Sequence, residues 1–156
     1  RGIFESLGFS NIETFIASGN VIFETRSKDA VALERTIEKK LEEVLGYEVA
    51  TFLRSDSELA RAADYKPFPT SQTDSATTLN IAFLSKSLDD HEKKLLAALK
   101  SDIDDFHAHG REVYWLCLKK QSESKFSNAV LEKTLGRKST LRGANTVKKM
   151  AEKYAA

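Results

Sequence analysis

Residues 77–141 constrain the fold most, because segments with the apolar pattern of a strand alternate with segments that have the apolar pattern of a helix. Four segments rich in β-forming residues are predicted to be strands: 77–84, 103–108, 111–118 and 139–141. Two segments with apolar residues at helical spacing lie between them, one capped at 87–90 and ending near Leu99, the other capped by Ser124 and ending at Leu135. The resulting order, β, α, β, β, α and a short β, is that of a ferredoxin-like split βαβ unit.

The first part of the chain predicts the later elements of the same unit. Residues 11–25 predict a β-hairpin that turns at Ser18-Gly19-Asn20, and residues 29–45 predict an amphipathic helix that ends at Gly46. A strand over 47–54 and a short helix over 55–65 follow. We expect the opening strand and most of the first helix to be missing from the sequence, since Arg1–Ile3 would close that strand and Phe4–Phe9 would end that helix.

We therefore predict an α+β chain of two tandem ferredoxin-like (βαββαβ) halves with an extra helix at the C-terminus. Val147, Met150, Ala151 and Tyr154 define the inner face of that last helix. Residues 67–76 contain both prolines of the chain and a polar cluster typical of a linker. The predicted halves are accordingly 1–66 and 77–156.

Several functional classes find no support in the sequence. No run of about 18 apolar residues could cross a bilayer, so we expect no membrane association. The single cysteine, Cys117, lies in an apolar run, which favours a buried thiol and a cytoplasmic protein. Neither a phosphate-binding loop nor a dinucleotide-binding glycine pattern occurs, and we expect no cofactor. His107 and His109 share a strand face, but no third ligand is evident, so we expect no metal site.

Positive charge is concentrated at the end of the chain. Residues 119–156 contain ten basic and three acidic residues, although the net charge of the whole chain is only +1. Such a segment can be a solvated helix face or an anion-binding surface, and the N-terminus of the last helix would add partial positive charge beside Arg142. The candidate anion-binding residues are Arg142, Asn145, Thr146, Lys125, Lys149, Arg111, Ser18 and Asn20.

Aromatic residues on the predicted strands allow a second interpretation. Ferredoxin-like sheets that bind RNA stack bases on aromatic side chains of an open face, and either Tyr114 or Trp115 must point to that face. Phe15 and Phe23 occupy the equivalent hairpin of the first half. Large aromatic side chains are more often part of a core, and we favour that interpretation.

The order and spacing of several short motifs resemble the domain-of-unknown-function family numbered 1697 (DUF1697) over nearly the whole chain. The motifs are Arg1-Gly2-Ile3, Leu7-Gly8-Phe9, Ser18-Gly19-Asn20-Val21-Ile22-Phe23, Lys66-Pro67-Phe68-Pro69, Gly110-Arg111-Glu112-Val113-Tyr114, Ser124-Lys125-Phe126 with Asn128, and Arg142 with Asn145-Thr146-Val147. The resemblance implies a bacterial protein, and that a glycine-rich loop and a helix would lie between the first two motifs. It implies no reaction.

Three functional classes remain open from the sequence. Our first hypothesis is a binding module for an anionic partner, either nucleic acid or a phosphorylated small molecule. A small-molecule enzyme with its site in a groove between the halves and a protein-interaction module are the alternatives. The sequence does not indicate an oligomeric state.

Overall fold

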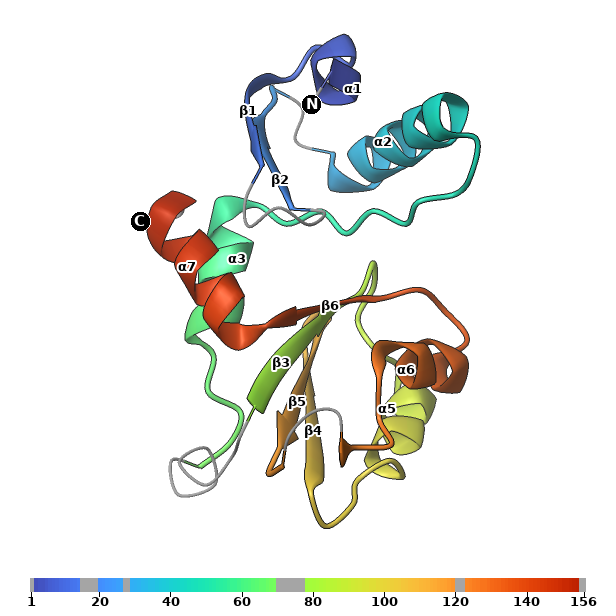
Figure 1. Ribbon diagram of the computed structural model, residues 1–156, viewed down its shortest axis with the longest axis vertical. Coiled ribbons are helices and arrows are strands. Elements are labelled where there is room, and N and C mark those ends of the chain that lie inside the picture. The colour runs from blue at the N-terminus through green and yellow to red at the C-terminus, as the bar shows by residue number, and fades with distance from the viewer. Residues whose placement is uncertain (1, 15–19, 27–28, 70–77, 120–122, 155–156) are drawn as a thin grey trace. The chain divides into compact units, whose positions relative to one another are not determined.

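A computed structural model describes residues 2–14, 20–26, 29–69, 78–119 and 123–154 of the chain (Figure 1). Within these ranges the protein is a mixed α+β protein with six helices and two antiparallel sheets. It divides into two compact units, Arg1–Arg54 and Ser55–Ala156. None of the described helices has the length and apolar character needed to span a membrane.

The first unit contains a β-hairpin and two helices, with the bounds α1 Gly2–Ser6, β1 Ser10–Thr14, β2 Val21–Glu24 and α2 Ala30–Leu45. The two strands pair antiparallel, as predicted, with an irregular register between Ser10 and Glu13. The predicted turn residues Ser18 and Gly19 lie outside the described residues. Phe4, Ile12 and Ile37 form the core, and Phe9 stacks on Phe23 with ring centroids 4.4 Å apart.

Helix α2 begins and ends where the sequence predicts. The side chain of Asp29 accepts a hydrogen bond from the Ala32 N–H, and Gly46 closes the helix in the left-handed conformation with φ 80°. Glycine adopts this conformation without steric cost, which explains the stop. Ile37 on the inner face is fully buried.

Two predictions for the first unit are wrong. Gly2 and Ile3 belong to α1 rather than to the end of a strand. Residues 47–54 form no strand, because their backbone bonds to side chains instead of to a neighbouring strand. Thr51 N donates to Glu38 Oε2 at 3.0 Å, and Leu53 N donates to Glu34 Oε1 at 2.9 Å.

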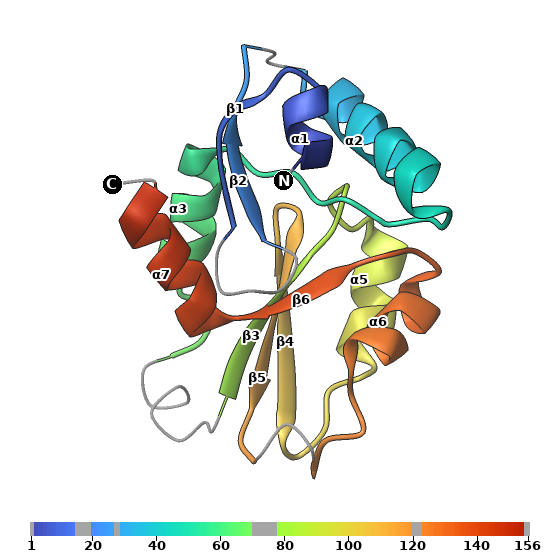
Figure 2. The same ribbon diagram turned by 45° about the horizontal axis from the view of Figure 1, so that its top comes forward.

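The second unit contains a four-stranded sheet and four helices, best seen in Figure 2. Its elements are α3 Asp56–Asp64, β3 Thr78–Phe83, α5 Asp90–Ala97, β4 Asp104–His109, β5 Glu112–Cys117, α6 Asn128–Leu135, β6 Thr140–Gly143 and α7 Ala144–Tyr154. The strands lie in the order β4-β5-β3-β6, and every pair is antiparallel. From β3 to α7 the order of elements agrees with the prediction.

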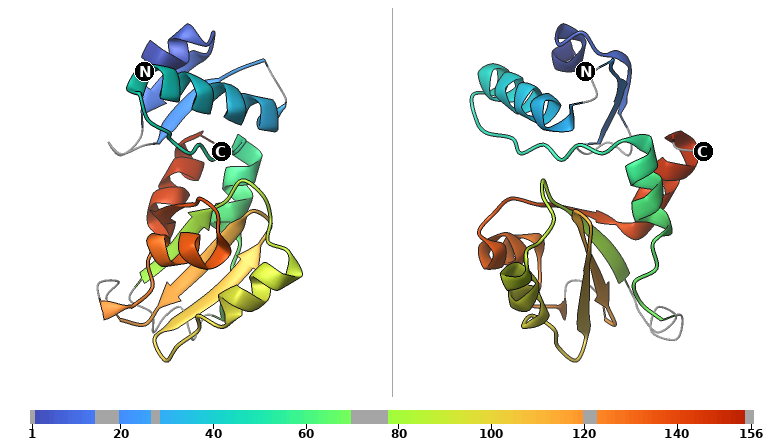
Figure 3. Two further views of the ribbon diagram at one scale, coloured as in Figure 1. Left: turned by 90° about the vertical axis from the view of Figure 1, so that its right-hand side faces the viewer. Right: turned by 180° about the vertical axis from the view of Figure 1, so that it is seen from behind.

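Helices lie on both sides of this sheet (Figure 3). On one side, side chains of α5 and α6 such as Leu96 and Leu131 pack with Trp115 of β5 in a buried core. On the other side, α3 packs against α7, and Tyr114 Oη donates to the carbonyl oxygen of Ala62 at 2.7 Å. Both faces of the sheet are therefore covered within this unit.

Two details of the second unit differ from the sequence analysis. Ser124 does not cap α6, because its hydroxyl donates to Asp104 Oδ2, and Ser127 is the cap that accepts from Val130 N. The units divide at Arg54 and Ser55, whereas a linker was predicted at 67–76, of which residues 70–76 lie outside the described ranges. Helix α3 belongs with α7 in the second unit.

Candidate functional site

The strand register gathers polar side chains at one end of the sheet in the second unit. Two rows of paired residues cross the sheet there: Thr140, Phe83, Glu112 and His109 in one row, and Arg142, Ile81, Tyr114 and His107 in the next. Because side chains alternate along a strand, these rows share the face on which α3 lies. Three polar residues lie next to these rows: Glu58 in α3, Tyr65 at its end and Arg111 in the turn between β4 and β5. We call them, with the polar residues of the rows, the hairpin-end site: Glu58, Tyr65, His107, His109, Arg111, Glu112, Thr140 and Arg142.

Arg142 lies on the outer strand β6, and its side chain turns back along its own strand. Its Nη1 donates to Thr140 Oγ1 at 2.8 Å and to the carbonyl oxygen of Leu141 at 2.9 Å. The side chain is partly buried, and burial lowers the pKa of the guanidinium because removal from water disfavours the charged form. The guanidinium of Arg142 is thus fixed by two hydrogen bonds and has lost part of its hydration.

Arg111 lies beside Gly110 in the turn between β4 and β5 and forms an ion pair with α3. Its Nη2 contacts Glu58 Oε2, and the other oxygen of that carboxylate, Oε1, accepts from the backbone N–H of Ser55 at 2.9 Å. Burial alone would raise the pKa of Glu58, but the hydrogen bond from Ser55 and the pairing with Arg111 outweigh it and hold the pKa below its usual value. Glu58 therefore carries a negative charge at neutral pH.

Tyr65, the residue that ends α3, contacts both histidines of β4. Its hydroxyl oxygen lies 2.8 Å from His107 Nε2, and its ring stacks on His109 with centroids 3.7 Å apart and planes at 6°. The ring of Tyr114 contacts that of Tyr65, and burial raises the pKa of the Tyr114 phenol above the usual value. Both ends of α3 are consequently held on the β4–β5 hairpin.

The structure brings together only part of the predicted anion-binding set. Arg111 and Arg142 lie at the same end of the sheet, because Arg142 bonds to Thr140, Thr140 pairs with Phe83, and Leu84 N donates to Arg111 O. The remaining candidates lie elsewhere. Asn145, Thr146 and Lys149 are on α7, Lys125 precedes Phe126 on the α5–α6 side of the sheet, Asn20 is in the first unit, and Ser18 is outside the described residues.

The helix that begins at Ala144 does not receive the head group of Arg142, since that head group bonds to Thr140 and Leu141 instead. Asn145 and Lys149 are exposed to solvent, and no acidic residue lies in the first turn of α7. Anion binding at these positions stays a prediction.

The aromatic residues of the central strand do not form an open stacking platform. Tyr114 and Trp115 are each 1% exposed, so the core interpretation is confirmed for both. Phe23 packs in the core of the first unit, and Phe15 lies outside the described residues. In the part of the chain that the structure describes, no group of three or more His, Cys, Asp or Glu residues is arranged to hold a metal ion.

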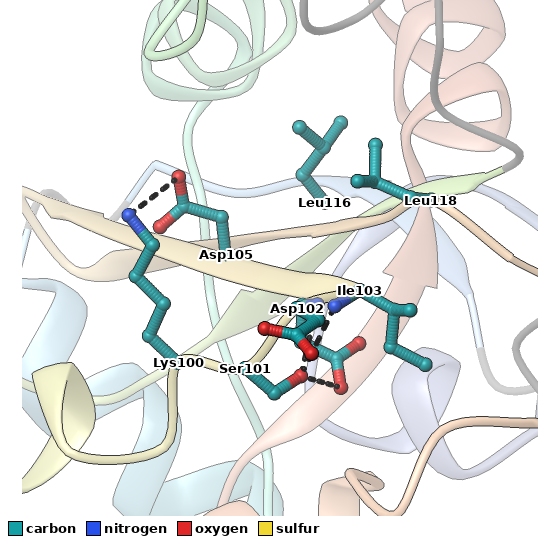
Figure 4. Close-up of a pocket in the computed structure, with 8 residues that line it drawn as sticks. Lys100, Ser101, Asp102, Ile103, Asp105, Leu116 and Leu118 are labelled. Carbon is teal, nitrogen blue, oxygen red and sulfur yellow. Dashed lines mark hydrogen bonds and ion pairs between the residues drawn. The ribbon is translucent and has the colours of Figure 1, made fainter.

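A small pocket lies at the opposite end of β4, near the start of that strand (Figure 4). Its volume is about 90 Å³, and its lining includes Lys100, whose Nζ lies 3.8 Å from Asp105 Oδ2. Asp104, which also lines it, is buried and accepts from Trp115 Nε1 at 2.8 Å and from Ser124 Oγ at 2.7 Å. These bonds give Asp104 a structural role, and no predicted site residue lines the pocket.

Comparison with known proteins agrees with the motifs found in the sequence. The family model described as "Protein of unknown function (DUF1697)" matches residues 1–114. The chain belongs to the DUF1697 family. A solved structure of the conserved bacterial protein SP0830 from Streptococcus pneumoniae is similar, with a TM-score of 0.74 and 19% identity. The alignment covers 97% of this DUF1697 chain and 84% of the other, and it shows a shared fold. No curated protein matches the chain.

Glu58 and Tyr65 were not among the predicted site residues. Glu58 was visible as part of a capping box, and Tyr65 as the end of a helix, but their partners lie more than forty residues away in sequence, as the 53-residue separation of Glu58 and Arg111 illustrates. His107 and His109 were seen as a pair on one face, and the structure adds the tyrosine that contacts both.

Proposed function

We propose that the protein binds a phosphorylated small molecule at the hairpin-end site, with Arg142 and Arg111 as its cationic contacts. One observation supports this most: the pairing of β3 with β6 and the bond from Leu84 N to Arg111 O bring Arg142 and Arg111, 31 positions apart in the sequence, to the same end of the sheet. Phosphate is one of the two groups, with carboxylate, that match a guanidinium, since the planar fork donates two parallel hydrogen bonds.

The environment of Arg142 strengthens the argument for an anion. Its Nη1 donates to two neutral oxygen atoms, those of Thr140 and Leu141, and its charge is partly removed from water. An anion that approached the guanidinium would offset this loss of solvation, and the attraction would exceed that of a fully exposed pair because the local dielectric constant is lower.

A small molecule is favoured over nucleic acid. Nucleic-acid surfaces combine a continuous basic stripe with exposed aromatic rings, whereas Tyr114 and Trp115 are buried here. The basic residues of the C-terminal segment are also divided between α6 on one side of the sheet and β6–α7 on the other. Two arginines at one end of the sheet suit a small phosphorylated ligand better than a polymer.

We further propose that the fold is a tandem of ferredoxin-like halves. The strand order β4-β5-β3-β6, with α5 and α6 in the two crossovers, supports this for the second unit. In the first unit the support is the sequence β1, β2, α2, which corresponds to the later elements of the same motif.

Titration calorimetry with inorganic phosphate and pyrophosphate tests the binding proposal. Arg142→Gln is expected to weaken binding about tenfold or more, since a charge-assisted hydrogen bond contributes about 1.5–3 kcal/mol. Lys133→Gln, which removes an exposed charge on α6, is the matched control and should bind normally. Equal affinities for the three proteins would refute the proposal, and tight, salt-sensitive binding of a single-stranded RNA oligomer would favour nucleic acid instead.

A further inference from the structure

We infer that Glu58 is a built-in competitor for the ligand of Arg111, an inhibitory contact that an incoming phosphate group must displace. The inference rests on the proposed function of the hairpin-end site and adds its regulation. The carboxylate of Glu58 occupies Nη2 of Arg111, an atom through which that side chain would donate to a phosphate oxygen. Carboxylate and phosphate are alternative acceptors for the same donor.

The position of Glu58 is set by a second bond that does not depend on Arg111. Its Oε1 accepts from Ser55 N at 2.9 Å, and Glu58 N donates to Ser55 Oγ at 3.2 Å, which completes a capping box at the start of α3. The carboxylate is therefore kept near Arg111 by the helix cap, whether or not a ligand is present.

Competition of this kind has a measurable consequence. Because Glu58 and the ligand exclude each other at Arg111, part of the ligand's binding free energy is spent on breaking the ion pair. Removing the negative charge of Glu58 should therefore strengthen ligand binding. A residue with a purely structural role would leave the affinity unchanged or weaken it.

Glu58→Gln isolates the effect, because glutamine can still accept the bond from Ser55 N in a capping box but carries no charge. Asp64→Asn is the matched control, since it makes the same change of charge on the same helix at an exposed position. The measurement is the dissociation constant for inorganic phosphate by calorimetry at low salt, with melting temperatures recorded for each protein.

We expect Glu58→Gln to bind phosphate about two to five times more tightly than the wild type, the range for an ion pair near the surface. We expect Asp64→Asn to bind as the wild type does. If both variants bind more tightly by the same factor, the effect is one of overall charge and the inference is wrong.

The outcome for Arg142 separates this inference from the proposed function. If Arg142→Gln weakens phosphate binding while Glu58→Gln leaves it unchanged, the site exists without a competitor. If neither the wild type nor Glu58→Gln binds phosphate or pyrophosphate, both proposals fail. If Glu58→Gln binds phosphate and the wild type does not, the Glu58 carboxylate blocks the site completely, which supports the inference.

Discussion

Trp115 Nε1 donates a 2.8 Å hydrogen bond to Asp104 Oδ1 inside the second unit, where the indole is 1% exposed and the aspartate 5%. The second carboxylate oxygen of Asp104 accepts from Ser101 Oγ and Ser124 Oγ. One buried side chain thus joins the β5 strand to the loop before β4 and the loop before α6. A buried carboxylate is tolerated here because its oxygens have several donors.

Asp104→Ala should destabilise the protein by about 2–3 kcal/mol, because it leaves the buried indole N–H and two hydroxyl groups without their acceptor. The free energy of unfolding in urea provides the measurement. The neighbouring Asp105→Ala serves as the control, since Asp105 pairs with the exposed Lys100 at 3.8 Å and should contribute less than about 1 kcal/mol. Equal losses for the two variants would contradict the central role of Asp104.

The ion pair between Glu58 and Arg111 should make stability depend on pH in the acid range. The folded protein holds the pKa of Glu58 below the reference value of 4.5, so its contribution is present above that pH and is lost as the pH falls through the folded pKa. We expect the difference in unfolding free energy between wild type and Glu58→Gln to shrink as the pH is lowered from about 6 toward about 3. This range extends about one and a half pH units to either side of the reference value. A difference that does not change with pH would show that the pair contributes nothing.

Cys117 should resist modification in the folded state. The thiol is fully buried, and burial raises its pKa, so little reactive thiolate forms at neutral pH. Labelling with an aromatic disulfide reagent is expected to be slow in buffer and rapid in denaturant. Rapid labelling of the native protein would indicate that the edge strand β4 separates readily from β5.

Ser139 should be important for the placement of β6. The Ser139 hydroxyl donates to Asn128 Oδ1 at 2.5 Å, and Asn128 Nδ2 donates to the Ser139 carbonyl oxygen at 3.0 Å. The backbone N–H of Ser139 donates to Glu132 Oε2. Ser139→Ala removes one of these bonds at a buried position and should cost about 1–2 kcal/mol in thermal or urea unfolding.

The exposed Ser87→Ala, at a position where the backbone carbonyl rather than the hydroxyl accepts from Arg137, is the matched control and should be nearly neutral. A loss for Ser87→Ala as large as that for Ser139→Ala would mean that the bond to Asn128 is not the cause.

Local signals in the sequence predicted most of the second unit. Capping boxes, glycine stops and alternating segments depend on neighbours within a few residues, and these placed α3, α5 and the order of the strands. The cap of α6 was assigned to Ser124 rather than Ser127 because both precede the helix, and only the structure shows that Ser124 bonds to a buried aspartate.

The site was less predictable because it depends on partners distant in sequence. Charge density directed attention to Arg142 and the start of α7, but a guanidinium can turn either way along a strand, and here it bonds to Thr140. Arg111 was among the candidates, but without its acidic partner Glu58. Pairings across about 50 positions leave no pattern in a single sequence.

The extended segment that follows α2 is held by two glutamates of that helix through Thr51 and Leu53. Glu34 and Glu38 are four positions apart, a rise of about 6 Å on a helix, which matches the span of about 6.6 Å between alternate residues of an extended chain. Because the two spacings are nearly equal, each glutamate carboxylate meets one backbone amide of the segment. Lengthening the 46–50 connection by a single residue would present the wrong amides to both carboxylates, so the attachment tolerates changes of side chain there far better than a change of length.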